Sequence, residues 1–378
     1  PVEFMAGVMN CDLHLTDKLA VYAEEVRRNL EIEIIPPCVN RSDATFNVHD
    51  GCVVYALGAL KNVGVEAMKL ITEARENQPF VNLFDVARRV DLKRVGKRPM
   101  EMLTRAGAFD QLDANRHRVF RSLDALVNYS AAIHDQRNSN QVSLFGEAGD
   151  DLPEPRLSPV DDWLPNERLA EEHKAIGFYL SGHPLDDYMA PLKRQGVLTL
   201  AEVTAKAETG ALVAKIAGSI SGKQERKSAR GNRFAFAQLS DPTGLYEVTL
   251  FSDTLEAARE HLETGNNVVL TVEANLEADQ LKLLARSVSP VDAVAASAGG
   301  SEIAITVENE DAVISVANLL AKVRAESKRP GDNVVYIRPF RHDLDKDCEI
   351  KVGEDFVINP QIKGALKSLG GVVTVEDV

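Results

Sequence analysis

The residues best placed to bind a ligand are basic side chains beside two short turns that each carry a Gly or Asn between apolar residues. They are Lys61, Asn62, Val63, Gly64 and Val65 in the first turn and Gly96, Lys97 and Arg98 in the second. Gly, and less often Asn, accepts the left-handed backbone that a sharp turn between two helices needs. The N–H groups that open the following helix then face outward, and with the helix dipole they bind phosphate without reading sequence. We therefore expect a duplex-DNA-binding surface here; the alternative is an ordinary helical hairpin with solvated lysines.

A second candidate set combines a basic loop with two aromatic residues on a predicted strand. Its members are Lys223, Arg226, Lys227, Arg230, Arg233, Phe234 and Phe236. Aromatic rings beside a basic groove stack on the bases of single-stranded nucleic acid. The same rings often fill the interior of a barrel instead, and the alternation with Ala235 and Ala237 fits either orientation. The basic loop favours the ligand-binding interpretation.

A third set lies in the polar segment 138–151, where two large apolar residues interrupt Asn, Ser and Asp. The residues are Gln141, Ser143, Leu144 and Phe145. A solvated loop does not normally keep a Leu-Phe pair, so we interpret the segment as a linear peptide. Its apolar pair would enter a partner's groove while the Gln141 amide fixes the register. The alternative is that the pair folds back on its own domain.

Charge is distributed unevenly along the 378 residues, whose net charge is -14. Residues 57–118 contain twelve basic and eight acidic side chains, and residues 215–233 contain six basic and one acidic. Residues 147–172 carry nine acidic against two basic. This pattern predicts two nucleic-acid contacts separated by an acidic linker.

No apolar run is long enough for a membrane span, which needs about 20 residues. The four cysteines, Cys11, Cys38, Cys52 and Cys348, are scattered along the chain, which fits a reducing cytoplasm. Three aspartates, Asp343, Asp345 and Asp347, have the spacing of a calcium loop, but Cys348 stands where that loop needs Gly. We expect a charged turn, no metal site and no catalytic residues in this chain.

The elements predicted to position the two basic turns, residues 61–65 and 96–98, are helices. A short helix over 55–60 is predicted to lead into the first turn, and a helix that begins at Pro99 and ends at Gly107 is predicted to follow the second. A long helix runs from about 112 to 137, with apolar residues at spacings of four and three. After it, the Pro-rich acidic stretch 150–163 is typical of a linker.

The second half of the chain alternates between strands and helices. Residues 210–292 predict five strands with one helix after the third, which is the order of an OB-fold barrel. Residues 302–378 predict a compact α+β domain. The fold class is therefore multidomain α+β, with the domains 1–55, 56–137 (tandem helix-hairpin-helix), 138–166 (peptide and acidic linker), 167–209 (helical connector), 210–292 (OB-fold), 293–301 (linker) and 302–378.

Several motifs together resemble the C-terminal third of the bacterial replicative DNA polymerase III alpha subunit. They are the runs at 1–6, 36–42, 57–64, 80–85, 106–110 and 177–184. The resemblance is strong through residue 290 and thin thereafter. It implies, in order, the end of the fingers domain, tandem hairpins on duplex DNA, an internal peptide for the sliding clamp (beta subunit), an OB-fold near the single-stranded template, and a C-terminal domain for the tau subunit of the clamp loader.

Two positions depart from the family's pattern. Asn62 stands where the family usually has Gly, and Gly96 stands where it often has Asn. Both residue types tolerate a left-handed turn, so we expect the hairpins to be kept.

The family's Mg-binding aspartates lie in an upstream palm domain, so the fragment should not polymerise DNA alone and should need no cofactor. Two alternatives remain open: a single-strand-binding or repair scaffold, and the error-prone alpha paralogue.

Overall fold

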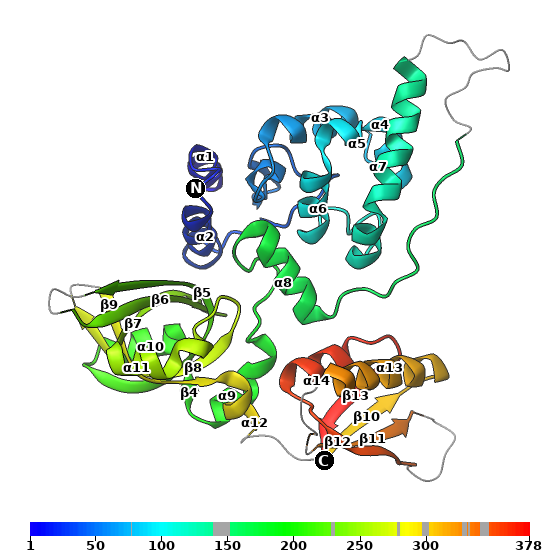
Figure 1. The fold of residues 1–378 in the computed structure, drawn as a ribbon. Coiled ribbons are helices and arrows are strands. Elements are labelled where there is room, and N and C mark those ends of the chain that lie inside the picture. Colours follow the sequence, from blue (N-terminus) through cyan, green and yellow to red (C-terminus); the bar gives the residue numbers. More distant parts are fainter. Residues whose placement is uncertain are drawn as a thin grey trace. The chain divides into compact units, whose positions relative to one another are not determined.

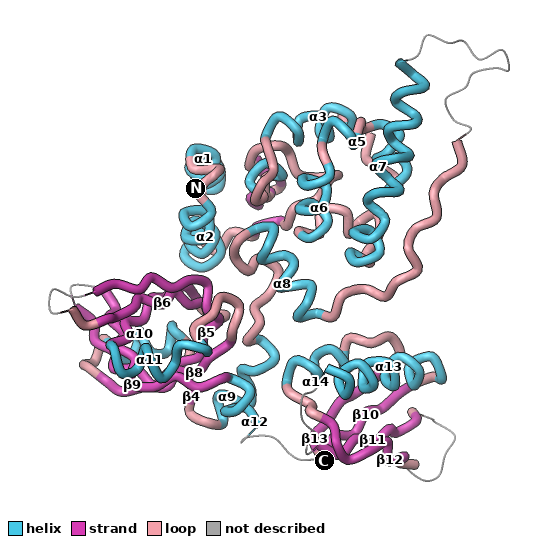
Figure 2. The backbone as a smooth tube through the Cα atoms, viewed as in Figure 1, coloured by secondary structure: helices cyan, strands magenta, loops and turns pink. Residues whose placement is uncertain are grey.

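The computed structural model divides the chain into two units, residues 1–181 and 182–378, and each is described by itself. It describes residues 1–76, 78–138, 152–227, 231–277, 280–296, 302–326, 331, 333–340 and 348–378. Figure 1 shows the elements with their labels, and Figure 2 shows the same backbone coloured by helix, strand and loop.

Unit 1 is mostly helical and is built on one continuous hydrophobic core. Its helices are α1 (Val2–Cys11), α2 (Thr16–Glu24), the π-helix η1 (Glu25–Asn29), the 3-10 helix η2 (Leu57–Ala59), α3 (Val65–Arg75), α4 (Leu83–Arg89), α5 (Leu92–Val95), α6 (Lys97–Arg105), α7 (Arg116–Asn138) and α8 (Pro165–Ile176). A small sheet of β1 (Ile34–Ile35), β2 (Asn47–His49) and β3 (Cys52–Val54) has the order β1-β3-β2. The β2–β3 turn uses positive φ angles at Asp50 and Gly51, as expected of an Asp-Gly hairpin.

Two details of the predicted hairpin helices are wrong. The predicted helix over 55–60 is only the 3-10 turn η2, because Leu57 and Gly58 donate their N–H groups to the carbonyls of Asp43 and Ala44 at 2.9 and 3.0 Å. These bonds to a neighbouring segment replace the pattern of an α-helix. In addition, α6 begins at Lys97, so Pro99 is its third residue. Pro is tolerated there because first-turn N–H groups have no intrahelical acceptor.

The acidic stretch predicted as a linker lies against the long helix α7 where the structure describes it. We call residues 152–164 the strap. The Ser158 N–H donates to Ser122 Oγ at 2.8 Å, and the Asn115 side chain donates to the Val160 carbonyl at 2.8 Å. The Trp163 ring stacks on the His117 ring at 5.4 Å. Figure 1 shows the strap running beside α7 to the start of α8.

Two of the strap's three acidic side chains form ion pairs within unit 1. Glu154 pairs with Arg88, and Asp162 pairs with Arg168 at 2.6 Å. Composition alone predicted a solvated tether, because Pro and acidic residues are typical of linkers. Specific basic partners and the apolar residues Leu152 and Leu157, which pack against the core, give this stretch a fixed path instead.

Helix α8 belongs to the hairpin unit. The buried guanidinium of Arg116 lies 2.8 Å from the Asp110 carboxylate and 3.7 Å from the carboxylate of Glu172 on α8. Glu172 is itself buried and accepts the N–H groups of Leu180 and Ser181 at 3.0 and 2.9 Å. Through these contacts the Glu172 side chain joins α8 to Arg116 and to the turn that follows the helix.

Unit 2 contains a closed five-stranded barrel with the order expected of an OB-fold. Its elements are η3 (Asp186–Tyr188), α9 (Met189–Arg194), β4 (Val197–Leu198), α10 (Leu200–Ala207), β5 (Leu212–Lys227), β6 (Arg233–Asp241), β7 (Gly244–Phe251), α11 (Ser252–Ala258), η4 (Arg259–His261), β8 (Asn267–Glu277), β9 (Gln280–Pro290) and α12 (Val291–Ala296). The sheet order is β4-β5-β6-β7-β9-β8, and pairing of β5 with β8 closes the barrel. Strands β7 and β9 are parallel, and helix α11 follows β7, which confirms the predicted strand and helix order.

The C-terminal domain is α+β, as predicted. It contains β10 (Glu302–Val307), α13 (Glu310–Glu326), β11 (Asn333–Pro339), β12 (Ile350–Phe356), α14 (Pro360–Lys367) and β13 (Val372–Asp377). The sheet order is β12-β11-β10-β13. The predicted linker 293–301 starts inside α12. Within the part of the chain that the structure describes, no helix is long and apolar enough to cross a membrane.

Candidate nucleic-acid interface

The two predicted turns adopt the backbone that their residue types allow. Asn62 has φ 60° and Gly96 has φ 95°, so both departures from the family's usual residue keep a positive φ. The turns differ in detail. Gly96 is itself the residue before helix α6, whereas Asn62 lies two residues before Gly64, which precedes helix α3. The second hairpin is therefore the tighter of the two.

The helices that follow these turns begin without a side-chain cap. Helices α3 and α6 have no capping hydrogen bond, whereas Asn82 caps α4 and Asp91 caps α5. The first N–H groups of a helix have no intrahelical acceptor, so an uncapped exposed start attracts anions. The first N–H groups of α3 and α6 are therefore suited to binding phosphate, whereas side chains already accept hydrogen bonds from the first N–H groups of α4 and α5.

Basic side chains surround the second helix start more clearly than the first. Lys93, Arg94 and Arg98 are exposed, and Lys97 pairs with Asp124 on α7 at 2.7 Å. Solvent screens an exposed ion pair of this kind, so a phosphate can displace Asp124 at little cost. Lys93 and Arg94 were not among the site residues predicted from the sequence. The signal was available, because Asp91 is a plausible N-cap that places both residues on the short helix before Gly96.

Lys61 and the first turn are engaged with α8. The Lys61 N–H donates to the Ala175 carbonyl at 2.8 Å. A Cβ built on Gly177 would lie 2.5 Å from Lys61 Cε and 2.2 Å from a methyl carbon of Thr16. Gly177 ends helix α8 with φ 101°, so the Lys61 side chain lies at the negative end of that helix dipole. The structure thus places Lys61 at a packing junction, with Val63 buried, and leaves Asn62 and Gly64 exposed.

The same junction changes the protonation of His173 on α8. Burial, together with the nearby charge of Lys61, lowers the pKa of His173 from 6.5 to about 4. The neutral ring contacts the Tyr179 ring at 4.7 Å between centroids. His173 is therefore a packing residue. His183 accepts the Leu185 N–H at 3.1 Å and caps the turn there.

On the barrel, the orientation of the two phenylalanines is settled by their neighbours. Ala235, Ala237 and Leu239 are fully buried and form the interior, so Phe234 and Phe236 lie on the outer face of β6. Their rings contact each other edge to face at 5.5 Å, and the Arg226 guanidinium lies 5.5 Å from the Phe236 ring. Phe236 stands opposite Thr249, and Phe234 opposite Phe251.

Phe251 extends this aromatic surface and was missed from the sequence. Its side chain is 57% exposed at the end of β7. The signal was the alternation along β7, where Tyr246, Val248 and Leu250 are the apolar inward residues and leave Phe251 on the other face. Phe234, Phe236 and Phe251 together form what we call the aromatic face.

The basic residues predicted beside these rings are divided between two faces. Arg226 stands opposite Phe234 and shares the aromatic face, whereas Lys223 stands opposite Ala237 and Lys227 opposite Arg233 on the other face. Lys223 also pairs with Glu225 at 3.4 Å. Of the predicted basic set, the described register therefore brings only Arg226 to the rings. Arg230 lies outside the described residues.

The predicted clamp-binding residues lie outside the described residues as well. They are Gln141, Ser143, Leu144 and Phe145. The same holds for Asp343, Asp345 and Asp347 of the turn that we compared with a calcium loop.

The described geometry defines a class of protein: a helical unit with tandem hairpins joined in one chain to an OB-fold barrel. Residues 31–119 match the family described as helix-hairpin-helix motif, which covers both hairpins. The chain is 37% identical to DNA polymerase III subunit alpha of Caulobacter vibrioides over 380 residues, covering 100% of this chain and 32% of the relative. The corresponding protein of Thermus aquaticus is 33% identical over 94% of this chain and 29% of its own length.

The chain belongs to the family of the DNA polymerase III alpha subunit and matches the C-terminal portion of those proteins. It spans about a third of the length of these relatives. Among solved structures, the second OB-fold domain of replication protein A from Methanococcus maripaludis is 17% identical, with a TM-score of 0.18 over 21% of this chain and 85% of that one. The yeast mitochondrial single-stranded DNA binding protein Rim1 is 23% identical, with a TM-score of 0.19 over 21% of this chain and 94% of that one.

Proposed function

We propose that this chain is the DNA-holding and tethering portion of a replicative polymerase, without a catalytic role of its own. The observation that carries the proposal is the aromatic face, where Phe234, Phe236 and Phe251 are presented outward on a barrel whose interior is already filled. These rings lie on the outer face of adjacent strands and are not part of the barrel's hydrophobic core. They offer bases a stacking surface, and Arg226 beside Phe236 adds a charge for the backbone.

The hairpin unit supplies the second DNA contact in this proposal. The uncapped starts of α3 and α6 would bind phosphates of the duplex, with Arg98, Lys93 and Arg94 reinforcing the second start. The first turn contributes mainly backbone, because Lys61 is held against α8. Backbone and guanidinium contacts to phosphate carry no base information, so duplex binding should not depend on sequence.

Fluorescence anisotropy with a blunt duplex and with a single strand of mixed sequence tests both contacts. We expect Arg98→Ala to weaken duplex binding and Phe236→Ala to weaken single-strand binding, each with little effect on the other ligand. If one substitution weakens both ligands equally while the fold is kept, the division of labour between the hairpins and the barrel is wrong.

The tethering part of the proposal concerns the segment around Leu144 and Phe145 and the domain 302–378. The pair would enter an apolar groove of the sliding clamp, with Gln141 and Ser143 orienting it, and the C-terminal domain would bind the clamp-loader tau subunit. Burying a Leu and a Phe contributes about 1.5–3 kcal/mol each before ordering costs, which permits a reversible micromolar contact.

Calorimetry with purified clamp tests this tether. Changing Leu144 and Phe145 together to Ala should abolish clamp binding and leave duplex and single-strand binding unchanged. Unchanged clamp affinity would reject the assignment. A loss of thermal stability in the variant would show instead that the pair packs on its own domain.

A further inference from the structure

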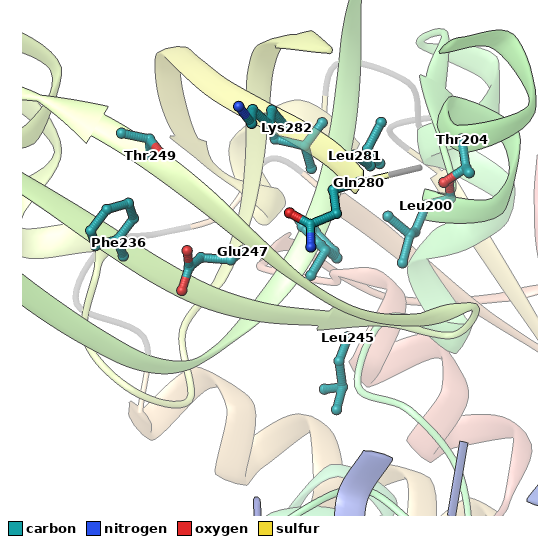
Figure 3. A pocket seen from close by; sticks show the side chains of 11 residues that line it. Leu200, Thr204, Phe236, Leu245, Glu247, Thr249, Gln280, Leu281 and Lys282 are labelled. Atoms are coloured by element: carbon teal, nitrogen blue, oxygen red, sulfur yellow. The ribbon is translucent and has the colours of Figure 1, made fainter. Parts of the chain in front are cut away.

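A groove beside the aromatic face combines apolar walls with a small number of polar groups. Its volume is about 470 Å³. Helix α10 contributes to its wall, and the lining side chains include Phe236 of β6, Leu245 and Glu247 of β7, and Gln280, Leu281 and Lys282 of β9. Figure 3 shows the Glu247 carboxylate between the Phe236 ring and the Gln280 amide. The groove therefore continues the stacking surface toward β9 and α10.

Glu247 is the unexpected member of this groove. It is exposed on β7, with Gln238 of β6 as its register partner. The nearby Lys282 pairs with Glu277. A carboxylate repels the phosphates of a nucleic acid, so its position beside a stacking ring disfavours the backbone at this point of the groove. It does not disfavour a base, because a base edge carries N–H donors.

The chemistry of a carboxylate selects among the bases. An ionised carboxylate only accepts hydrogen bonds, and its two oxygens bind two parallel N–H donors best. Guanine presents N1–H and N2–H side by side on its Watson–Crick edge. Adenine and cytosine present one amino group beside an acceptor nitrogen, and thymine presents one N–H between two carbonyl oxygens.

The remaining lining fits the same ligand. The Phe236 ring can stack on the base plane, and Leu245 and Leu281 provide apolar contact. The Gln280 side-chain amide offers a donor for the guanine O6, on the same edge that faces Glu247. A stacked base with three hydrogen bonds to its edge is a typical mode of recognition for an unpaired nucleotide.

We propose that this groove is a guanine-binding pocket, in which Glu247 accepts the N1–H and N2–H of the base, Gln280 donates to O6 and Phe236 stacks on the ring. The proposal rests on the proposed single-strand binding by the barrel and gives that site a base preference. The guanine can belong to a DNA strand or to a free nucleotide, and the experiment separates these sources.

The test uses the full chain with oligo-dT strands that carry one central dG, dA or dC, and calorimetry with dGMP and dAMP. We expect the dG strand to bind about 10-fold more tightly than the dA strand, because a bidentate contact discriminates between bases. Glu247→Gln should remove this preference. Glu263→Gln, which removes the same charge at an exposed position outside the groove, should keep it.

Each of the possible binding results either supports or overturns the guanine pocket. Preference for the dG strand places the guanine in DNA, and dGMP binding that Glu247→Gln removes, without a strand preference, assigns the pocket to a free nucleotide. Equal binding of all strands and no binding of dGMP overturn the guanine pocket while leaving single-strand binding intact. Failure to bind any strand rejects the proposed single-strand function. Calorimetry with dGMP then tests the guanine pocket separately. A preference that survives Glu247→Gln also overturns the role given to that carboxylate.

Discussion

The hairpin unit and the barrel present DNA with different parts of the protein. In the hairpin unit the candidate groups are backbone N–H groups at the starts of α3 and α6, and cationic side chains gather around the start of α6. In the barrel the candidate groups are aromatic rings on the outer face of β6 and β7, with one guanidinium beside them. The first arrangement matches the phosphates of a duplex, whose bases are covered. The second matches a single strand, whose bases are free to stack.

The two regions also differ in what holds the site in place. The first hairpin turn is held by contacts with α8 through Lys61 and Gly177, and the Arg116–Glu172 pair holds α8. The aromatic face depends on the ladder of the barrel itself, where register fixes the side of each residue. A change at the α8 junction should therefore damage the hairpins, and a change on the barrel surface should affect binding alone.

The largest effect is expected from Gly177→Ala. The new methyl group would lie 2.2 Å from Thr16 Cγ2 and 2.5 Å from Lys61 Cε, at a φ of 101° that disfavours any Cβ. Left-handed strain and overpacking together should lower the free energy of unfolding of unit 1 by about 2–4 kcal/mol. Urea unfolding followed by the fluorescence of Trp163, the single tryptophan of the chain, measures this directly.

Gly7→Ala is the matched control for that experiment. Gly7 lies within α1 with nothing within 4 Å of an added Cβ, so Ala should stabilise the helix slightly. Equal stability of the Gly177 variant and the wild type would mean that the α8 junction does not hold the hairpin turn.

Phe236→Ala should have the next largest effect, on binding alone. Loss of one stacking ring costs about 1–3 kcal/mol of single-strand affinity. The fold should persist, because Phe236 lies outside the barrel interior formed by Ala235, Ala237 and Leu239. Phe4→Ala removes a ring that is 71% exposed in the other unit and serves as the control. A variant that unfolds, yet binds normally per folded molecule, would assign the ring to the core.

A smaller effect, on pH dependence, is expected at His173. Its pKa is lowered from 6.5 to about 4 by burial and by Lys61. Between these values the unfolded chain binds a proton that the folded chain does not, so the stability of unit 1 should fall as the pH drops from about 6.5 to about 4. His173→Gln should flatten this part of the curve, whereas His49→Gln, at a 68% exposed side chain, should not. The same pH dependence in both variants would contradict the assignment.

Much of this architecture was readable from the sequence because local patterns set it. Alternation along the strands predicted the five-stranded barrel, and residue types at Asn62 and Gly96 predicted the two positive-φ turns. The strap was not predictable, because its path depends on partners distant in sequence such as Arg88 and Ser122. For the same reason, Lys61 was assigned to phosphate although it packs against α8.

Which face of β6 points into the barrel could not be predicted from the sequence, for a different reason. Both faces of β6 carry apolar residues, so period two predicts a strand without telling which face is inside. Closure of the barrel decides it, by burying the small residues Ala235 and Ala237 and leaving the larger rings outside.

The salt dependence of binding tests the division between the two regions most directly. For two unrelated duplexes, Arg98→Ala should reduce the slope of log affinity against log salt concentration by about 1, equally for both sequences. Phe236→Ala should lower single-strand affinity with the slope unchanged, because a ring releases no counterions. A duplex slope that Arg98→Ala leaves unchanged, a loss that depends on duplex sequence, or a single-strand slope that falls with Phe236→Ala would contradict this account.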